Sequence, residues 1–403
     1  MWGLASCSAR AQRGFSSCNF FTEERGIRIN LPVESLRVEF LPMASHRSAL
    51  SPAQLRSFRR ALLHWYDQHR RDLPWRRDRH PYRVWVSEIM LQQTRVAAVL
   101  EHYGRFVERF PTVQSLAAAR EASVLAIWSG LGYYHRARRM HQAAKIIARE
   151  LAGAFSQTAE EWSQLPGIGR YTAAAIASIA FGEPVAVVDG NVERVIQRLF
   201  GNTQVSPTVG RTLRQAQGRP WGPAASATVK SQSRESAWQQ AEALLDRARP
   251  GDFNQAMMEL GATICTPRVP QCLICPLNEL CRSRGAGPPR MQPARKRKSI
   301  SFAFARNNSA VLLVRRPESS SLMAGMWELP ALDRSQVNGN EPLLRLRHSI
   351  TDTDYHVSIF AIPPHELPGL ATEARWATRK QWQQLPLTGL TRKVLRRLSS
   401  GAV

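Results

Sequence analysis

Hydrophobic side chains recur at helical spacing through most of residues 52–180. Strand-like alternation of polar and apolar residues is scarce there, and the spacing is that of one apolar face on successive α-helices. We therefore expect this stretch to be all α-helical. The pattern is clearest in Leu55, Phe58, Leu62, Trp65 and Tyr66, and again in Val96, Val99, Leu100, Tyr103 and Phe106.

Further helices are expected downstream. Asp189 ends the apolar run Val185–Val188 and opens a helix through Leu199, and helical periodicity returns in Trp238–Leu245 and Phe253–Ile264. Between them, residues 206–236 are dominated by Pro, Gly, Ser, Gln and Ala without periodicity. We interpret that stretch as an exposed and largely disordered insertion.

The composition of the chain and its pattern of apolar residues change after residue 282. Residues 283–299 are rich in Pro, Gly, Arg and Lys, which is typical of a basic linker. Short apolar runs at 302–304, 310–314 and 355–360 then predict strands. The expected fold is mainly α, with a helical domain over residues 46–282 and a smaller α+β domain over residues 300–398.

The first 45 residues do not match either domain. They begin like a weak organelle presequence, with Arg10 and Arg13 and no early acid, but Glu23 and Glu24 break that pattern. We expect a disordered extension, or a non-native start with Met43 as the true initiator.

Charge narrows the range of partners. The 403-residue chain carries a formal net charge of +24, which favours a polyanion such as nucleic acid. A membrane is not expected as a partner, because no uninterrupted apolar run approaches about 18 residues. Only six cysteines occur, four of them clustered, which suggests a reducing intracellular setting: cytoplasm or nucleoid in a bacterium, nucleus or mitochondrion in a eukaryote. We expect a monomer.

Four cysteines follow the spacing C-x6-C-x2-C-x5-C. Thiolates this close in sequence can converge on one inorganic centre. Disulfides are disfavoured, because the second and third cysteines are too near each other to pair comfortably. Zinc is the simplest alternative, but the spacing is not the usual paired-CxxC pattern, so we expect a [4Fe-4S] cluster. The candidate ligands are Cys265, Cys272, Cys275 and Cys281.

A short glycine-containing turn, Leu165–Gly169, lies between two helical stretches. Gly167 and Gly169 let the backbone turn tightly, so that N–H groups and the start of the next helix can meet a phosphate. Over residues 165–173 this predicts a helix–hairpin–helix that holds the DNA backbone without reading sequence. An ordinary helix–turn–helix connection is the alternative.

Two carboxyls are candidates for catalysis. Asp189 is a helix N-cap by position, but a carboxylate at that place would also lie near any cation or phosphate bound there. Glu88 lies among Trp85, Ile89 and Leu91, where burial would raise its pKa and make it a proton donor near neutrality. A glutamate on the wet face of a helix is the alternative. Such a pair suits hydrolysis of a glycosidic bond, in which one group protonates the leaving base and the other stabilises the sugar cation.

With these pieces the chain resembles the MutY family of adenine DNA glycosylases, within the helix–hairpin–helix superfamily that includes endonuclease III. The resemblance covers residues 50–205 and 238–282 strongly and residues 300–395 weakly. The matching motifs are Leu73–Arg76, Trp85–Thr94, Gly130–Tyr134, Asp189–Val192, Phe253–Ala256 and the four cysteines.

The resemblance implies roles by position. Glu88 would protonate adenine, and Asp189 would stabilise the sugar cation or form a transient adduct with C1′, with Tyr171 and Asn191 helping to hold them. Gln92 and Tyr133 would insert into the duplex beside the flipped base. Gln255 would bond the adenine edge, and Arg268, in the loop held by the cysteines, would meet a phosphate.

Tyr171 separates two chemistries. Endonuclease III-like lyases have a lysine at this place, because strand cleavage needs an amine to form a Schiff base. A phenol cannot do this, which favours a monofunctional glycosylase acting on adenine opposite 8-oxoguanine or guanine in double-stranded DNA. An endonuclease III-like pyrimidine glycosylase/lyase and a non-catalytic iron–sulfur DNA-binding protein remain as alternatives.

The C-terminal part resembles the Nudix-like recognition domain of the same family. After Gly325–Pro330 no acidic metal-binding cluster follows, so we expect no pyrophosphatase activity. The family senses 8-oxoguanine through a Phe-Ser-His loop. Here the matching stretch, Arg347–Asp352, retains only Thr351 as a hydroxyl and His348 as a nearby candidate, which puts the strength of 8-oxoguanine discrimination in question.

Overall fold

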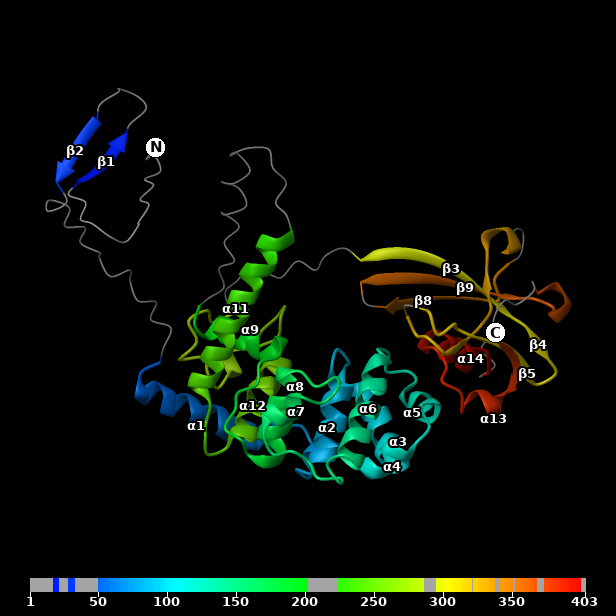
Figure 1. The fold of residues 1–403 in the computed structure, drawn as a ribbon, viewed down its shortest axis with the longest axis horizontal. Coiled ribbons are helices and arrows are strands. Elements are labelled where there is room, and N and C mark those ends of the chain that lie inside the picture. Colours follow the sequence, from blue (N-terminus) through cyan, green and yellow to red (C-terminus); the bar gives the residue numbers. More distant parts are fainter. Residues whose placement is uncertain are drawn as a thin grey trace. The chain divides into compact units, whose positions relative to one another are not determined.

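The computed structural model describes residues 17–21, 28–32, 50–201, 223–285, 295–320, 322–337, 341–350, 352–367 and 373–399 (Figure 1). By its internal contacts the chain divides into two units, Met1–Ala49 and Leu50–Val403. In the first unit, β1 (Ser17–Phe21) and β2 (Arg28–Pro32) pair as an antiparallel hairpin. A disordered extension was expected instead. The hairpin forms where Phe20, Phe21 and Ile29 favour strands. The other residues of 1–45 lie outside the described part.

The second unit begins with helices, as expected. Within residues 50–201 and 223–285 the structure has no β-strand, and no helix among the described residues combines the length and apolar character needed to cross a membrane. The α-helices are α1 (Pro52–His69), α2 (Pro81–Leu91), α3 (Val96–Arg109), α4 (Val113–Ala118), α5 (Glu121–Trp128), α6 (His135–Arg149), α7 (Ala159–Ser163), α8 (Arg170–Ile176), α9 (Gly190–Leu199), α11 (Pro223–Leu244) and α12 (Pro250–Thr263). Shorter turns are η2 (Pro74–Arg76), the π-helical η3 (Ala177–Phe181) and η4 (Cys272–Ile274).

Local chemistry explains several helix starts. Ser51 caps α1 in a capping box with Gln54, and Pro52 occupies the first turn, where its missing N–H costs nothing. Thr112 caps α4 in the same way. Asp189 caps α9, which confirms the helix expected from Asp189 to Leu199.

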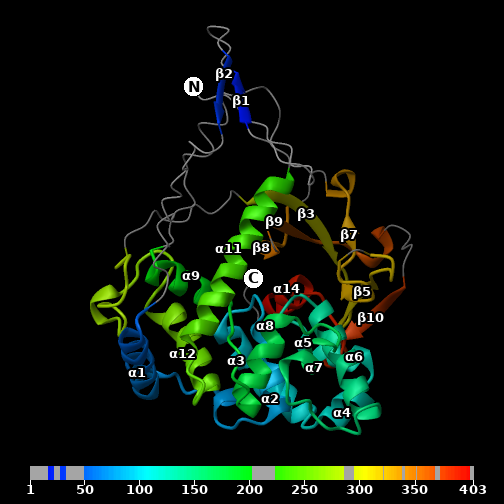
Figure 2. The same cartoon turned by 60° about the vertical axis from the view of Figure 1, so that its left-hand side comes forward.

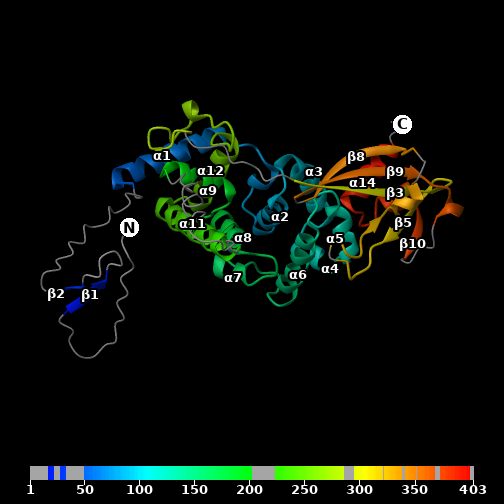
Figure 3. The same cartoon turned by 90° about the horizontal axis from the view of Figure 1, so that it is seen from above.

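The helical part has two hydrophobic cores. One is built mainly from α2, α3, α5, α6 and α8, and includes Trp85 and Trp128. The other joins α1, α9, α11 and α12, which lie together in Figure 3, and includes Phe58 and Phe253. The segment between α8 and α9 contributes Val187 to the first core and Val188 to the second, so the chain crosses between them just before Asp189.

Close packing at this crossing depends on glycine. A Cβ at Gly261 of α12 would lie 2.6 Å from the Cβ of Asn191, and one at Gly251 would lie 2.5 Å from the carbonyl oxygen of Ser178. Neither position has room for a side chain. The start of α9 therefore packs directly on α12.

The expected disordered insertion is corrected in part. Residues 223–236 belong to α11, which begins at Pro223 and runs beside α9 and α12 (Figure 2). The sequence pattern showed no sign of it, because large apolar residues do not recur at helical spacing between residues 223 and 236. Proline at a first helical turn also resembles a breaker when read from the sequence. Residues 206–222 lie outside the described residues.

The C-terminal part is α+β, as expected. Its strands form two sheets, ordered β10-β5-β4, with β6 also paired to β5, and β7-β3-β9-β8. The β3–β9 pair is parallel, in register from Lys296↔Thr353 to Phe304↔Ala361, and the other pairs are antiparallel. The elements are β3 (Lys296–Phe304), β4 (Arg306–Asn307), β5 (Ala310–Arg315), β6 (Trp327–Glu328), β7 (Ala331–Leu332), η5 (Arg334–Val337), β8 (Leu344–Ile350), β9 (Thr353–Ala361), η6 (Pro364–Glu366), β10 (Ala374–Thr378), α13 (Arg379–Trp382) and α14 (Gly389–Ser399).

The core of this part lies between α14 and the strands. Leu390, Val394 and Leu395 of α14 share one buried cluster with Leu313 of β5 and Ile359 of β9 (Figure 3). The expected linker of residues 283–299 is too long, because β3 already begins at Lys296. The first four residues of β3 are exposed and mostly basic, so by composition they resembled the linker.

Candidate active site

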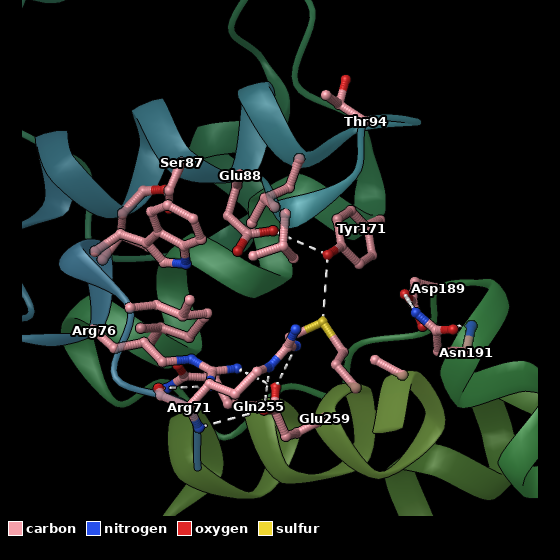
Figure 4. Close-up of a pocket in the computed structure, with 18 residues that line it drawn as sticks. Arg71, Arg76, Ser87, Glu88, Thr94, Tyr171, Asp189, Asn191, Gln255 and Glu259 are labelled. Carbon is pink, nitrogen blue, oxygen red and sulfur yellow. Dashed lines mark hydrogen bonds and ion pairs between the residues drawn. The ribbon is translucent and has the colours of Figure 1, made fainter. Parts of the chain in front are cut away.

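The sequence-predicted catalytic residues meet in one pocket of about 180 Å³ in the helical part (Figure 4). Its lining comes from both hydrophobic cores: α2 and α8 on one side, α9 and α12 on the other. Of the predicted residues, Glu88, Tyr171, Asp189, Asn191 and Gln255 line this pocket.

Glu88 lies on α2 with its side chain turned into the pocket and is only 5% exposed. The O–H group of Tyr171 donates a hydrogen bond of 2.9 Å to its Oε2. The pKa of Glu88 is raised to about 7, because burial and the nearby charge of Asp189 raise it more than the hydrogen bond from Tyr171 and the charge of Arg76 lower it. The interpretation of Glu88 as a glutamate on a wet helix face is therefore wrong.

Asp189 is both the N-cap of α9 and a residue of the pocket wall. Its Oδ1 accepts hydrogen bonds from the backbone N–H groups of Asn191 (2.8 Å) and Val192 (2.7 Å), so it is the N-cap of α9. Its Oδ2 accepts a bond of 2.9 Å from Nδ2 of Asn191. These three donors and the positive end of the helix hold a carboxylate in a defined orientation at the pocket wall.

Tyr171 belongs to the first turn of α8 and lies between the two carboxyls. Its hydroxyl is directed to Glu88 and is also 3.4 Å from the sulfur of Met258 (Figure 4). Burial, together with the negative charges of Glu88 and Asp189, raises the pKa of Tyr171 well above its usual value. The phenol therefore stays protonated and remains a hydrogen-bond donor at neutral pH.

Three charged pocket residues were not singled out from the sequence. Glu259 of α12 is 1% exposed and accepts from Nη2 of Arg71 at 2.8 Å and from Nη2 of Arg76 at 2.9 Å. Burial alone would raise the pKa of Glu259, but the hydrogen bonds from the two arginines outweigh it and lower the pKa. Of the three, only Arg76 lies in a motif noted in the sequence, Leu73–Arg76. Nothing marked Glu259, because its partners are more than 180 residues away along the chain.

Gln255 lines the pocket with one amide oxygen free of hydrogen bonds among the described residues. It lies on α12 facing the cavity, half-buried, with Nε2 donating to the carbonyl oxygen of Gly251 at 3.3 Å. The oxygen of the amide has no such bond among the described residues, so one acceptor is left for a ligand edge.

Gln92 and Tyr133 lie on two turns and do not line the pocket. Gln92 follows the end of α2, and its Nε2 donates to Oγ1 of Thr172 in α8 at 3.0 Å. Tyr133 precedes α6, is half-buried, and has a left-handed backbone with φ of +48°. Gly132 before it, at φ of +71°, also requires that conformation.

The glycine turn has the geometry expected for a helix–hairpin–helix. Gly167 has φ of +81°, and Gly169 is the N-cap of α8. The backbone N–H groups at the start of α8 have no side-chain cap, which leaves donors available to an anion.

The four cysteines line one small cavity together with Arg198, and no disulfide joins them. Nη1 of Arg198 donates to the sulfur of Cys265 at 3.2 Å. Among the described residues, no three His, Cys, Asp or Glu side chains are arranged to hold a single metal ion. Arg268, in the loop between the first two cysteines, is exposed.

In the C-terminal part, His348 lies in β8, paired across the hairpin with Tyr355 of β9. It is half-buried, and burial followed by the charge of Lys393 lowers its pKa. Thr351 lies outside the described residues.

Known proteins match this chain over most of its length. A family profile described as the HhH-GPD superfamily of base excision DNA repair proteins matches residues 86–218. The human adenine DNA glycosylase is 35% identical over 85% of this chain and 74% of its own length. The rat protein of the same name is 39% identical over 72% of this chain and 63% of its own length. Among solved structures, a thermostable thymine-DNA glycosylase covers 58% of this chain and 97% of its own, with 27% identity and a TM-score of 0.48.

Proposed function

Because the chain belongs to the adenine DNA glycosylase family, we propose that its pocket performs base excision with Glu88 as the acid and Asp189 as the stabilising anion. The enzyme hydrolyses the bond between adenine and deoxyribose in DNA. One observation carries the assignment of roles: a buried carboxyl with a pKa of about 7 and a capped carboxylate line the same pocket.

The reaction needs one proton and one water. Glu88 transfers its proton to N7 of adenine, which lets the C1′–N9 bond break with its electron pair going to the base. The sugar is left as an oxocarbenium ion, whose positive charge Asp189 stabilises directly or as a transient covalent adduct at C1′. Water then adds to C1′ and loses a proton to the Glu88 carboxylate, giving an abasic site and the starting form of the enzyme.

Holding the carboxylate is the second requirement. Asn191 bonds Asp189 through both its backbone and its side chain, which holds the carboxylate in one orientation. Tyr171 stays protonated and donates to Glu88, which orients the acid. Gln255 offers its amide to the edge of the base.

The base reaches the pocket only when it leaves the duplex. Gln92 and Tyr133, on neighbouring turns, fill the gap it leaves. Gly167 and Gly169 hold the phosphate backbone through N–H groups at the start of α8, and Arg268 adds a further phosphate contact. None of these contacts selects a sequence.

The preferred substrate is adenine paired with 8-oxoguanine or guanine. The C-terminal part, as a Nudix-like recognition domain, contacts the opposite base through the β8–β9 hairpin, with Thr351 and His348 as the polar side chains. Thr351 keeps a hydroxyl of the family's Phe-Ser-His loop, but the aromatic and the histidine of that loop are absent here, so we expect weak discrimination of 8-oxoguanine from guanine.

Product analysis tests the function. Duplexes with A opposite 8-oxoguanine, G or T are incubated with the full chain, and free adenine and strand breaks are measured separately. We expect adenine release from the first two, no strand cleavage without alkali, and at least roughly 10²-fold slower release for Asp189→Asn. Strand nicking without alkali together with borohydride trapping would instead indicate a lyase, contrary to a phenol at position 171.

The cysteine cavity fits a cluster better than a single ion. A lone zinc bound by four thiolates at about 2.3 Å needs all its sulfurs within roughly 4 Å of each other, whereas a cuboidal cluster holds them farther apart. The four thiols line one cavity, and their C-x6-C-x2-C-x5-C spacing is not the usual paired-CxxC zinc pattern. Cys265, Cys272, Cys275 and Cys281 would hold a [4Fe-4S] cluster, which supplies a rigid link between the cysteine loop and α9. The Arg198 bond to Cys265 suits a thiolate.

Elemental analysis decides between the metals. The purified chain should contain about four irons with matching acid-labile sulfide, and Cys272→Ser should lose them. Leu273→Ala in the same loop, where the side chain is 97% exposed, is the matched control and should keep the iron. One zinc per chain and no iron would overturn the assignment.

A further inference from the structure

Arg136, in the first turn of α6, is a buried arginine with an unusual set of partners. It is 5% exposed, and no acid pairs with it among the described residues. Its partners are instead oxygens from two turns of the chain. Burial lowers the pKa of Arg136 to about 10, so the guanidinium is still charged at neutral pH.

One side of the guanidinium holds the end of α2. Nη1 donates to the carbonyl oxygens of Ile89 at 2.9 Å, Met90 at 3.1 Å and Gln92. These are among the last carbonyls of a helix, which have no partner within it and carry its negative end. Nη2 adds Oγ1 of Thr94 at 3.1 Å.

The other side holds the turn before α6. Nη2 also donates to the carbonyl oxygens of Leu131 at 3.3 Å and Gly132 at 3.2 Å. The guanidinium carbon lies 5.4 Å from the ring centroid of Tyr133. Both turns are strained, since Gln93 and Tyr133 have φ of +54° and +48°.

We propose that Arg136 is a positioning residue that sets the spacing of Gln92 and Tyr133 for insertion into the duplex. This rests on the function proposed above. A planar fork with several donors can bond oxygens from two chain segments at once, which an ammonium group cannot do in the same geometry. With the fork removed, the two turns relax independently, and the gap in the duplex is no longer filled as the base leaves.

The test compares a stacked adenine with one that is already unpaired. Arg136→Lys keeps the charge but not the fork. Single-turnover excision is measured with adenine opposite guanine, and with adenine opposite a stable abasic analogue, where extrusion costs less. We expect roughly 100-fold loss on the first duplex and no more than a few-fold loss on the second, because displacement of a positioning group by about 1 Å costs that much.

Two comparisons give the result its meaning. Glu88→Gln should lose activity equally on both duplexes, as expected for a group that acts in bond cleavage. Arg149→Lys, at the exposed far end of α6, is the matched control and should behave as wild type on both. An equal loss for Arg136→Lys on the two duplexes would overturn the proposal, because Arg136 would then act on the pocket and not on insertion.

A second readout does not depend on excision. With 2-aminopurine beside the target adenine, fluorescence reports unstacking, and Arg136→Lys should lower the amplitude or rate of that change. The proposal fails if the variant's signal equals that of wild type. If wild type unstacks the duplex but releases no adenine, the proposed function fails and this measurement still judges Arg136. Should Arg136→Lys not fold, Thr94→Val removes one acceptor of Arg136 together with the hydroxyl that donates to the carbonyl of Gln92, and it should give a smaller loss in the same direction.

Discussion

Two glutamates in the pocket differ only in what surrounds them. Glu88 receives one bond from a neutral phenol, and burial raises its pKa. Glu259 is as deeply buried but is bonded by two guanidinium groups, which lower its pKa. One site thus contains an acid that still holds a proton near neutrality and a carboxylate that does not.

The pH dependence of excision follows from Glu88. As the proposed acid, Glu88 must be protonated to act, and its pKa is raised to about 7, so the active fraction is expected to be high below that value and to fall as pH rises through it. We expect the single-turnover rate at saturating enzyme to fall about tenfold per pH unit above the midpoint.

Duplex binding measured over the same pH range is the control, since it should change little. A rate that stays constant from roughly pH 6 to 9 would show that Glu88 is not the acid in the rate-limiting step.

At the scale of elements, the turn before α8 depends on a backbone shape that only glycine adopts easily. Gly167 has φ of +81°, and a Cβ there would lie 2.6 Å from the Cβ of Arg139, an atom that cannot swing aside. Gly169 has φ of −96°, and a Cβ there would meet nothing within 4 Å. The two glycines of one motif therefore have different tolerances.

Alanine substitution separates them. Gly167→Ala should destabilise the protein by about 2 kcal/mol or more, from the left-handed backbone and the contact with Arg139, and should weaken binding to any duplex. Gly169→Ala should cost less than about 1 kcal/mol. Urea midpoints and duplex titrations measure both effects, and equal losses at the two positions would contradict this account of the turn.

At the scale of the whole molecule, charge governs the encounter with DNA. The net charge of +24 attracts DNA of any sequence, because it acts on the phosphates that every duplex has. The proposed chemistry, by contrast, acts in the pocket on one base that has left the duplex. Affinity and chemistry thus depend on different parts of the chain.

Salt should weaken duplex binding and leave the rate of base excision nearly unchanged. We expect the affinity for duplex to fall by roughly 10³-fold or more between 50 and 200 mM salt, with the same slope for matched and mispaired duplexes. Single-turnover excision at saturating enzyme should change little. A flat salt dependence, or different slopes for the two duplexes, would mean that few phosphates are contacted or that base contacts dominate binding.

The amino-acid sequence alone determined the helical character of residues 50–201, the strands near 302, 310 and 355, and the chemistry available at positions 88, 171 and 189. These follow from local spacing and residue type, which need no knowledge of distant contacts. It did not determine the start of α11, because large apolar residues do not recur at helical spacing between residues 223 and 236.

Only the tertiary structure decided which charges meet. Arg71, Arg76 and Glu259 come together from segments over 180 residues apart, and Arg136 joins two turns more than 35 residues apart. Whether a buried carboxyl keeps its proton depends on whether a guanidinium stands beside it. That is set by the packing of two helical cores around one pocket, and no local pattern encodes it.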